Sequence, residues 1–419
     1  MRNPIYILII FILSTITWGQ NIEVSPPQHI KTVQLFNPQT NDNTPIIRLG
    51  SNEYLLFLFD DLNGGYKRYN YKIEHRNADW SESNIFQSEY LIGYTSDYVR
   101  TYKNSFNTYQ RYTNYQIQFP NRDMNVKLGG NYLLKVYTDN EDKPLFTKRF
   151  AVYQGNVEVG LNTSRYINPT NKDFNQRIQA IITSGNQNLI ESNDAARLFI
   201  MKNNNWEDHV VAFQPDFSRT NQLTYNNVNI NFEGGAEYNW FDTKNLDVPG
   251  LTTERNFRKD SVYHTVLRVD YPKYNLPYDD FGDINGNFYI RNNRYGNEYL
   301  AASEADYTWV YFALQDFEDQ NGLYEAYVVG AFNNWDISPD SKLKYDDESK
   351  LWVNEYFLKQ GYYNYQYVVK NTKTGKLEPS YVSGSFWQAE NMYQGLFYYR
   401  PWGARYDVLM GFGFSNTRK

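Results

Sequence analysis

The chain has 419 residues, enough for two to four domains of ordinary size. A net charge of −6 and a pI near 5.4 argue against a basic surface for nucleic acid or anionic lipid. The sequence contains no cysteine, which excludes disulfides, thiolate metal sites, a cysteine nucleophile and a cysteine-linked lipid anchor.

The first residues have the order of a secretory signal peptide. Arg2 supplies a positive charge, residues 5–13 are apolar, and Thr17-Trp18-Gly19 ends the segment with a small residue. The apolar run is too short to span a bilayer. We therefore expect residues 1–19 to be removed, leaving an exported, soluble protein that begins at Gln20. Export without disulfides is typical of a bacterial envelope protein whose domains are held together by burial.

Aromatic residues are abundant, with 40 Tyr, 26 Phe and 9 Trp. Such residues favour strands, and they also make good contact surfaces because they offer a large area at low entropy cost. Since they are spread along the whole chain, we interpret them mainly as the mark of an all-β protein.

Alternating patterns fill the chain as far as residue 153. Tyr69, Tyr71, Ile73 and His75 alternate with polar residues, which predicts a strand with one wet face and a half-buried, hydrogen-bonded His75. Further strands are expected at residues 54–59, 114–119, 132–137 and 145–153. Short strands separated by Asp, Asn and Gly predict a first β-sandwich over residues 20–153.

Two more sandwiches are expected beyond a hinge at Gln154-Gly155-Asn156. The second, over residues 154–302, has predicted strands at residues 176–182, 197–201, 228–232, 262–269 and 287–290, with a long loop at 239–258. The third, over residues 303–419, has predicted strands at residues 307–314, 324–329, 351–358, 362–369 and 406–412. Helical periodicity is almost absent, so the predicted class is all-β, with tandem immunoglobulin-like sandwiches.

The segment Gly330-Ala331-Phe332-Asn333-Asn334-Trp335, between predicted strands, resembles the immunoglobulin-like sandwiches of the glycogen-binding family. In that family the Trp of this turn stacks on sugar, which makes Trp335 a candidate glycan contact, with Asn391 in place of a late family Asn. However, Gln366 stands where that family has a Lys, and residues 371–379 contain no second Trp. These departures argue against tight glycan binding and favour a packing role for Trp335.

Catalytic and metal-binding motifs are missing from the sequence. The histidines at positions 29, 75, 209 and 264 have no metal-ligand spacing, and neither a nucleophile elbow nor an HExxH motif occurs. Asp283-Ile284-Asn285-Gly286 starts like a calcium loop, but its Gly comes at position four and no Glu follows at position twelve. We expect no enzyme, no cofactor and no metal, although paired carboxylates for glycoside hydrolysis remain open because their separation is spatial.

A second resemblance covers nearly all of the mature chain. The segment 69–75, then Asp79-Trp80, then 89–93 with Tyr90 and Gly93, resembles the first domain of the plug-protein family of the type IX secretion system. Further segments that fit this family are residues 105–108, 112–115, 119–121, 130–137, 390–393, 398–400 and 405–407.

This resemblance implies a non-enzymatic periplasmic protein that binds the outer-membrane β-barrel translocon and seals its periplasmic opening. Association with the outer membrane would then run through a protein partner. His75, Asp79, Trp80, Tyr90 and Gly93 occupy family-motif positions and are expected to be structural. The alternative function is a periplasmic glycan-binding accessory protein that uses its C-terminal domain.

Overall fold

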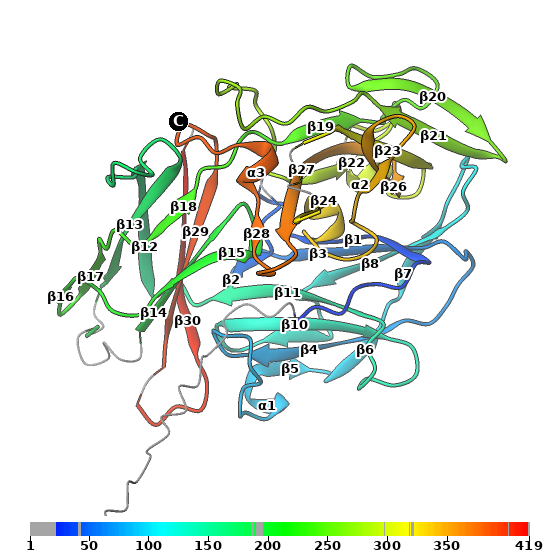
Figure 1. The fold of residues 1–419 in the computed structure, drawn as a ribbon. Helices are drawn as coiled ribbons and strands as arrows, with labels where there is room; N and C mark the ends of the chain where they lie inside the picture. Colours follow the sequence, from blue (N-terminus) through cyan, green and yellow to red (C-terminus); the bar gives the residue numbers. More distant parts are fainter. Residues whose placement is uncertain are drawn as a thin grey trace, which may run out of the picture.

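A computed structural model describes residues 22–40, 43–185, 188–189, 196–296, 298–317, 319, 322–400 and 402–417 (Figure 1). Within these residues the helices are single turns: α1 (Gln87–Tyr90), α2 (Glu298–Ala301) and α3 (Ser380–Ser383). The predicted all-β class with tandem β-sandwiches is confirmed. The predicted signal peptide lies outside the described residues. Nowhere in the described ranges is a helix long and apolar enough to cross a membrane.

The N-terminal sandwich is built from strands between residues 30 and 153. One sheet has the order β1 (Ile30–Phe36), β3 (Leu55–Asp61), β8 (Thr113–Phe119), β7 (Thr101–Asn104). The other has the order β2 (Ile46–Arg48), β11 (Phe146–Tyr153), β10 (Gly130–Tyr137), β4 (Asn70–Arg76), β6 (Ser96–Tyr98). A short ribbon joins β5 (Leu91–Gly93) to β9 (Met124–Val126).

Aromatic side chains fill the space between these two sheets. The ring of Phe59 lies 5.2 Å from Tyr69, 5.1 Å from Tyr115 and 5.3 Å from Phe146, centroid to centroid. The hydroxyl of Tyr69 donates to Asp61 Oδ2 at 2.9 Å, which satisfies its polar end inside the protein. The core therefore uses large rings in offset and edge contacts, as the composition suggested.

The middle sandwich is assembled from two separate parts of the chain. One sheet has the order β12 (Val157–Arg165), β13 (Asn175–Ser184), β17 (Gln222–Tyr225), β16 (Phe217–Arg219), with β18 (Asn231–Glu233) also on β13. The other has the order β15 (Asn205–Ala212), β14 (Ala196–Lys202), β29 (Met392–Tyr399), β30 (Val408–Asn416).

The inserted sandwich lies between those two parts in the sequence. Its first sheet has the order β19 (Asn239–Asp242), β27 (Gly361–Asn371), β22 (Phe288–Ile290), with β24 (Tyr324–Val329) and β28 (Leu377–Glu378) also on β27. The second has the order β20 (Thr253–Lys259), β21 (Val262–Leu267), β23 (Tyr307–Gln315), β26 (Leu351–Lys359), β25 (Lys344–Asp346).

The strand pairing differs from the predicted division of the chain after residue 153. A single core joins Phe241 to Val310 and Tyr365, so it runs across the break predicted at residue 303. β29 and β30 belong to the sheet of β14, not to the sandwich that precedes them (Figure 1). Period-2 patterns identify strands but not their partners, so the sequence could not reveal this insertion. We propose a middle domain of residues 157–233 with 392–416 that encloses an inserted domain of residues 239–383.

Several predicted strands need smaller corrections. The expected long loop at residues 239–258 contains β19 and most of β20, and the strand predicted at 228–232 is reduced to β18. β20 is polar and mostly exposed, with only Thr253 buried, so its alternation is too weak to read from the sequence.

Deletion of residues 389–419 tests the insertion. Because β29 covers β14, the amides of residues 196–202 should lose their protection against hydrogen exchange, whereas those of β24 should keep theirs. Hydrogen-exchange mass spectrometry of the purified full-length and truncated proteins measures both segments. Loss of protection at β24 with β14 unchanged would instead support the division at residue 303.

Candidate functional site: the domain junctions and an exposed aromatic corner

Trp80 stands at the interface between the N-terminal and middle sandwiches. It follows β4 with φ at 65°, and its ring meets that of Trp206 edge to face at 4.9 Å. The guanidinium of Arg149 lies 5.5 Å from the Trp80 ring. The buried cluster around them is shared by both sandwiches and comprises Ile46, Ala78, Trp80, Ala151, Phe199, Met201, Trp206, Leu396, Tyr398 and Leu409. The two sandwiches therefore share a dry apolar contact of the kind found inside a domain.

Hydrogen bonds between distant segments complete this interface. Asp407 Oδ2 accepts from the Ala78 backbone N–H at 3.0 Å, and the Asp407 N–H donates to Asn77 Oδ1 at 3.2 Å. The hydroxyl of Tyr398 donates to Asn131 Oδ1 at 2.6 Å. Asp407 and Tyr398 thus attach the C-terminal strands to two segments of the N-terminal sandwich that are far away in the sequence.

A buried ion pair joins the N-terminal sandwich to the inserted one. Lys359 Nζ lies 2.6 Å from Asp60 Oδ2, and the two side chains are only 1% and 0% exposed. The hydroxyl of Tyr307 donates to the same oxygen at 2.7 Å, and the ring of Tyr112 lies 4.1 Å below the ammonium group. Burial lowers the pKa of Lys359, and the Asp60 carboxylate opposes that shift.

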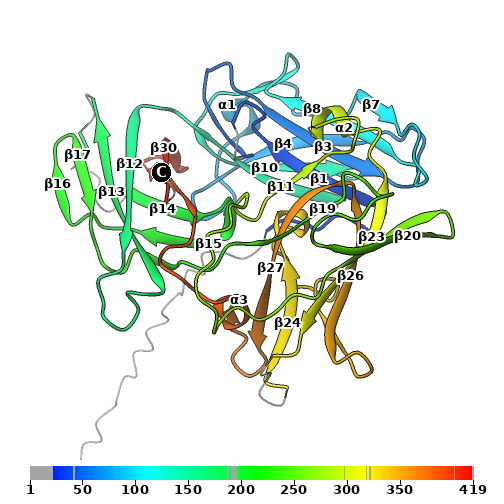
Figure 2. The same ribbon diagram turned by 90° about the horizontal axis from the view of Figure 1, so that it is seen from above.

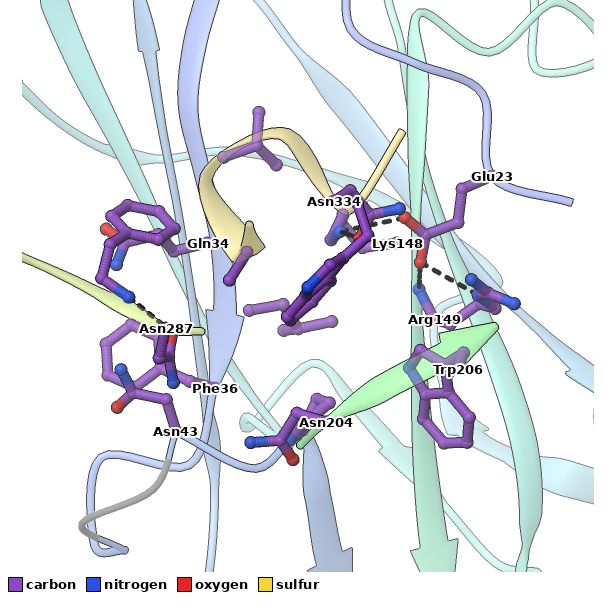
Figure 3. A pocket seen from close by; sticks show the side chains of 16 residues that line it. Glu23, Gln34, Phe36, Asn43, Lys148, Arg149, Asn204, Trp206, Asn287 and Asn334 are labelled. Atoms are coloured by element: carbon purple, nitrogen blue, oxygen red, sulfur yellow. Dashed lines mark hydrogen bonds and ion pairs between the residues drawn. The ribbon is translucent and has the colours of Figure 1, made fainter. Parts of the chain in front are cut away.

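All three sandwiches meet around a small cavity of about 80 Å³ (Figure 3). Lys148 Nζ donates to Glu23 Oε2 and to Asn334 Oδ1, both at 2.9 Å, and the Arg149 N–H donates to Glu23 Oε1 at 2.8 Å. Burial opposes the ionisation of Glu23, but the two cations outweigh it and hold the pKa of the carboxyl below its ordinary value. Because the charged groups already neutralise one another and the space is small, we interpret this cavity as a joint rather than a ligand site.

The family-motif residue His75 lies deep in the N-terminal sandwich, more buried than expected. Its ring packs among Tyr90, Tyr132 and Tyr406, and its Nδ1 lies 2.9 Å from Ser83 Oγ. A Cβ at Gly130 would come within 2.2 Å of the imidazole, so a glycine is required there. Burial lowers the pKa of His75 to about 4, which makes it a neutral packing residue at physiological pH.

The other family-motif positions also make local contacts. Asp79 Oδ1 accepts from the Ser81 N–H at 3.0 Å, and this hydrogen bond closes the tight turn that contains Trp80. The hydroxyl of Tyr90 donates to the Ile73 carbonyl at 3.3 Å. Gly93 has φ at 92°, and a Cβ there would lie 2.1 Å from the Asp123 carbonyl oxygen. Each of these residues is thus engaged in a contact within the N-terminal sandwich.

The two candidate glycan residues occupy different environments. Trp335 is half-buried after the 3₁₀ turn η2 (Ala331–Asn333) and packs beside Tyr327, Val329 and Val368. Asn391 is 3% exposed in the middle sandwich, where its amide donates to the Gly234 carbonyl at 2.7 Å and its oxygen accepts from Asn203. Its carboxamide is therefore engaged inside the protein, and the structure offers no joint glycan platform.

The segment that resembled the start of a calcium loop serves as an internal turn. Asp283 Oδ1 accepts from the Asn285 N–H at 2.7 Å, and its Oδ2 accepts from the Tyr238 N–H at 2.5 Å. Burial raises the pKa of Asp283 to about 7, and Glu237 adds to this effect. Over the described residues, no three His, Asp or Glu side chains are grouped so as to hold a metal ion.

An exposed aromatic corner lies where the loop after β7 meets the hairpin β20–β21, with Arg258 of β20 against the ring of Tyr109. β7 and β20 lie on the same side of the molecule in both views (Figures 1 and 2). We define the corner by the exposed side chains of Tyr66, Tyr102, Phe106, Tyr109 and Phe257. The rings of Tyr66 and Tyr102 are 4.8 Å apart, and Tyr109 meets Tyr263 at 5.4 Å. The corner therefore spans the N-terminal and inserted sandwiches. Sequence analysis missed it because these residues come from turns and edge strands with no common periodicity.

A second exposed surface, the aromatic loop, follows β21. It consists of Val269, Tyr271, Tyr274, Leu276 and Phe281, all of them exposed. Exposed apolar side chains grouped in this way make the loop a candidate surface for contact with another molecule.

Comparison with known proteins identifies the family. Residues 30–154, which include the whole N-terminal sandwich, match the family described as the type 9 secretion system plug protein 1st domain. The chain belongs to the type IX secretion plug family. Membership gives the protein a role in type IX secretion, in agreement with the resemblance seen in the sequence.

Curated proteins provided no match to the chain. A solved structure does match, the crystal structure at 2.30 Å of a hypothetical protein from Parabacteroides merdae ATCC 43184. The two are similar with a TM-score of 0.88 and 30% identity, over 94% of this chain and 98% of that chain. The similarity over almost the full length of both chains includes the arrangement of the three sandwiches.

Substitution of His75 by glutamine should change the pH dependence of stability. The pKa of about 4 lies below the ordinary value of 6.5, so between these pH values the folded state binds fewer protons than the unfolded state. The contribution of neutral His75 is therefore present above pH 6.5 and is lost as the pH falls toward 4. Between pH 7 and pH 4 the wild type should lose about 3 kcal/mol more than His75→Gln, measured by urea unfolding. Parallel pH profiles would contradict this assignment.

Substitution of Lys359 should lower the free energy of unfolding, and a second substitution at Asp60 should offset much of that loss. Lys359→Met leaves the Asp60 carboxylate buried without its cation and should lower the free energy of unfolding by roughly 3–5 kcal/mol. A second change, Asp60→Asn, should restore most of that loss. Lys342→Met breaks a half-exposed pair with Glu325 and should cost less than about 1 kcal/mol. An equal effect of both lysine substitutions would show that burial of the pair is unimportant.

Proposed function

We propose that this protein binds the outer-membrane translocon barrel of the type IX secretion system and seals its periplasmic opening. The match of residues 30–154 to the plug family is the observation that supports this proposal most directly. In this proposal the protein acts in the periplasm and is held at the outer membrane through its protein partner. It carries out this role without catalysis.

The fixed arrangement of the three sandwiches suits a protein that seals an opening. The Trp80–Trp206 contact and the Asp60–Lys359 pair attach the N-terminal sandwich to both of its neighbours through buried side chains. A body whose parts are already fixed loses little conformational freedom when it binds, so more of the contact energy appears as affinity. A rigid protein also keeps its shape when it binds at the opening of the translocon.

The exposed aromatic surfaces supply contact area. A stable seal needs at least the roughly 1,600 Å² buried in an interface of standard size. Tyr and Phe are enriched at such interfaces because each buries a large surface with few rotatable bonds. The aromatic corner and the aromatic loop together provide ten exposed apolar or aromatic side chains for this purpose.

Gene deletion tests the sealing role. The deletion strain should become permeable to large polar compounds while the translocon remains in the outer membrane, because the open barrel would lack its periplasmic closure. Uptake of a large polar antibiotic or dye measures permeability, and complementation with the wild-type gene should restore the barrier. Unchanged permeability, together with purification of the translocon free of this protein, would contradict the proposal.

A further inference from the structure

One edge of the N-terminal sandwich is open. β7 ends the sheet order β1-β3-β8-β7, and each of its residues, Thr101 to Asn104, is exposed. It pairs with β8 on one side, and the described part of the chain shows no strand on the other. An open edge presents backbone N–H and C=O groups that can pair with a further strand.

Only some of the usual protections of an edge strand are present here, because β7 is short but regular. β7 carries one lysine, but it has no proline and no bulge in its pairing with β8. Its neighbours are the aromatic side chains of the corner, with Tyr102 on the strand itself and Phe106 and Tyr109 directly after it. An incoming strand would therefore gain both backbone hydrogen bonds and aromatic contacts along one line.

The segment that forms the edge of the corner is basic although the whole chain is acidic. The segment 100–111 contains Arg100, Lys103 and Arg111 and no Asp or Glu. Arg100 is paired with Asp97, whereas no ion pair within 4.0 Å engages Lys103 or Arg111 in the described residues. Lys103 and Arg111 are therefore available to an acidic partner, although Asp306, which accepts from the Tyr109 N–H, and Asp247, which accepts from Tyr263, lie on the side of the inserted sandwich.

The hairpin β20–β21 extends this surface from the inserted sandwich. β20 contributes Arg255, Arg258 and Lys259, against Glu254 on the same strand and Asp260 at the turn. The guanidinium of Arg258 lies 4.7 Å above the ring of Tyr109 and donates to its hydroxyl. The hairpin therefore places basic side chains beside the aromatic residues that follow β7.

We propose that an extended, acidic segment of the translocon docks on this corner by adding a strand to the free edge of β7. Backbone pairing requires an extended partner, and the lysine and arginine side chains select acidic residues on it. The aromatic side chains of the corner pack on its apolar residues. This assignment rests on the proposed sealing function and specifies the contact through which the protein is held.

The basic and aromatic character of the corner also suits single-stranded nucleic acid, which stacks its bases on such rings. The free backbone edge favours a peptide, because a nucleic acid does not use unpaired strand groups in a regular ladder. Binding of a fluorescent oligonucleotide at physiological salt, competing with the translocon, would overturn the proposal in favour of that ligand.

Binding of full-length variants to the purified translocon in detergent tests the docking site. The double variant Lys103→Glu, Arg111→Glu and the double variant Tyr102→Ser, Phe106→Ser should each weaken binding by about tenfold or more. Matched controls are Lys373→Glu, Lys376→Glu on the turn between β27 and β28, and Tyr271→Ser, Tyr274→Ser on the aromatic loop. The controls should bind as the wild type does.

Hydrogen exchange distinguishes strand addition from contact through side chains alone. In the complex, the backbone amides of Thr101 to Asn104 should gain protection of at least tenfold, whereas residues 271–281 should not. Failure of the wild type to bind the translocon would overturn the sealing function itself. Normal binding by the corner variants, or no added protection at β7, would leave the sealing function standing and overturn this docking site.

Discussion

The carboxylate of Asp60 is the group on which the arrangement of the protein most depends. It lies on a strand of the N-terminal sandwich, where Asn114 donates to Oδ1, and it receives Lys359 and Tyr307 from the inserted sandwich at Oδ2. A buried carboxylate is tolerated only when its charge is balanced and its oxygens are hydrogen-bonded. Docking of the inserted sandwich satisfies both needs, so the N-terminal sandwich is electrostatically incomplete without its neighbour.

The junction with the middle sandwich works on a different principle. There the contact is mainly apolar, with Trp80 and Trp206 at its centre. Hydrogen bonds of Asp407 and Tyr398 fix the position of one sandwich relative to the other. An apolar contact supplies binding free energy without directional demands, whereas a buried ion pair tolerates only one geometry. Together the two junctions give the sandwiches both adhesion and a defined relative orientation.

Aromatic side chains have two uses in this protein, and burial separates them. Inside the sandwiches, Tyr69 and Tyr307 place their hydroxyls on carboxylates, so that these two rings fill the core with their polar ends hydrogen-bonded. At the corner, Tyr66, Tyr102 and Tyr109 belong to an edge strand and turns, and their side chains stay exposed. The same residue type thus serves packing or contact according to its place in the sheet.

Much of the fold was predictable from local pattern. The strand at residues 69–76 appears as β4 with Tyr71, Ile73 and His75 inward, and the strand at 324–329 appears with those bounds, because alternation reports which face is buried. The family was also predictable, since its motif residues contact one another within the N-terminal sandwich and across to residues 398–407. The polar strand β20 and the exposed corner were not, because neither has a buried face to impose a pattern.

The sequence by itself determined the strand class, the family and the absence of cysteine chemistry, all of which depend on residue types or on spacing within a short segment. Only the tertiary structure decided which strands share a sheet. β29 lies beside β14 although nearly two hundred residues separate them in sequence, because the free energy of a strand pair depends on the face that each strand buries and not on chain order. The same distinction applies to charge. Net charge is additive and can be read from composition, but the basic corner exists only where folding brings residues 100–111 beside β20.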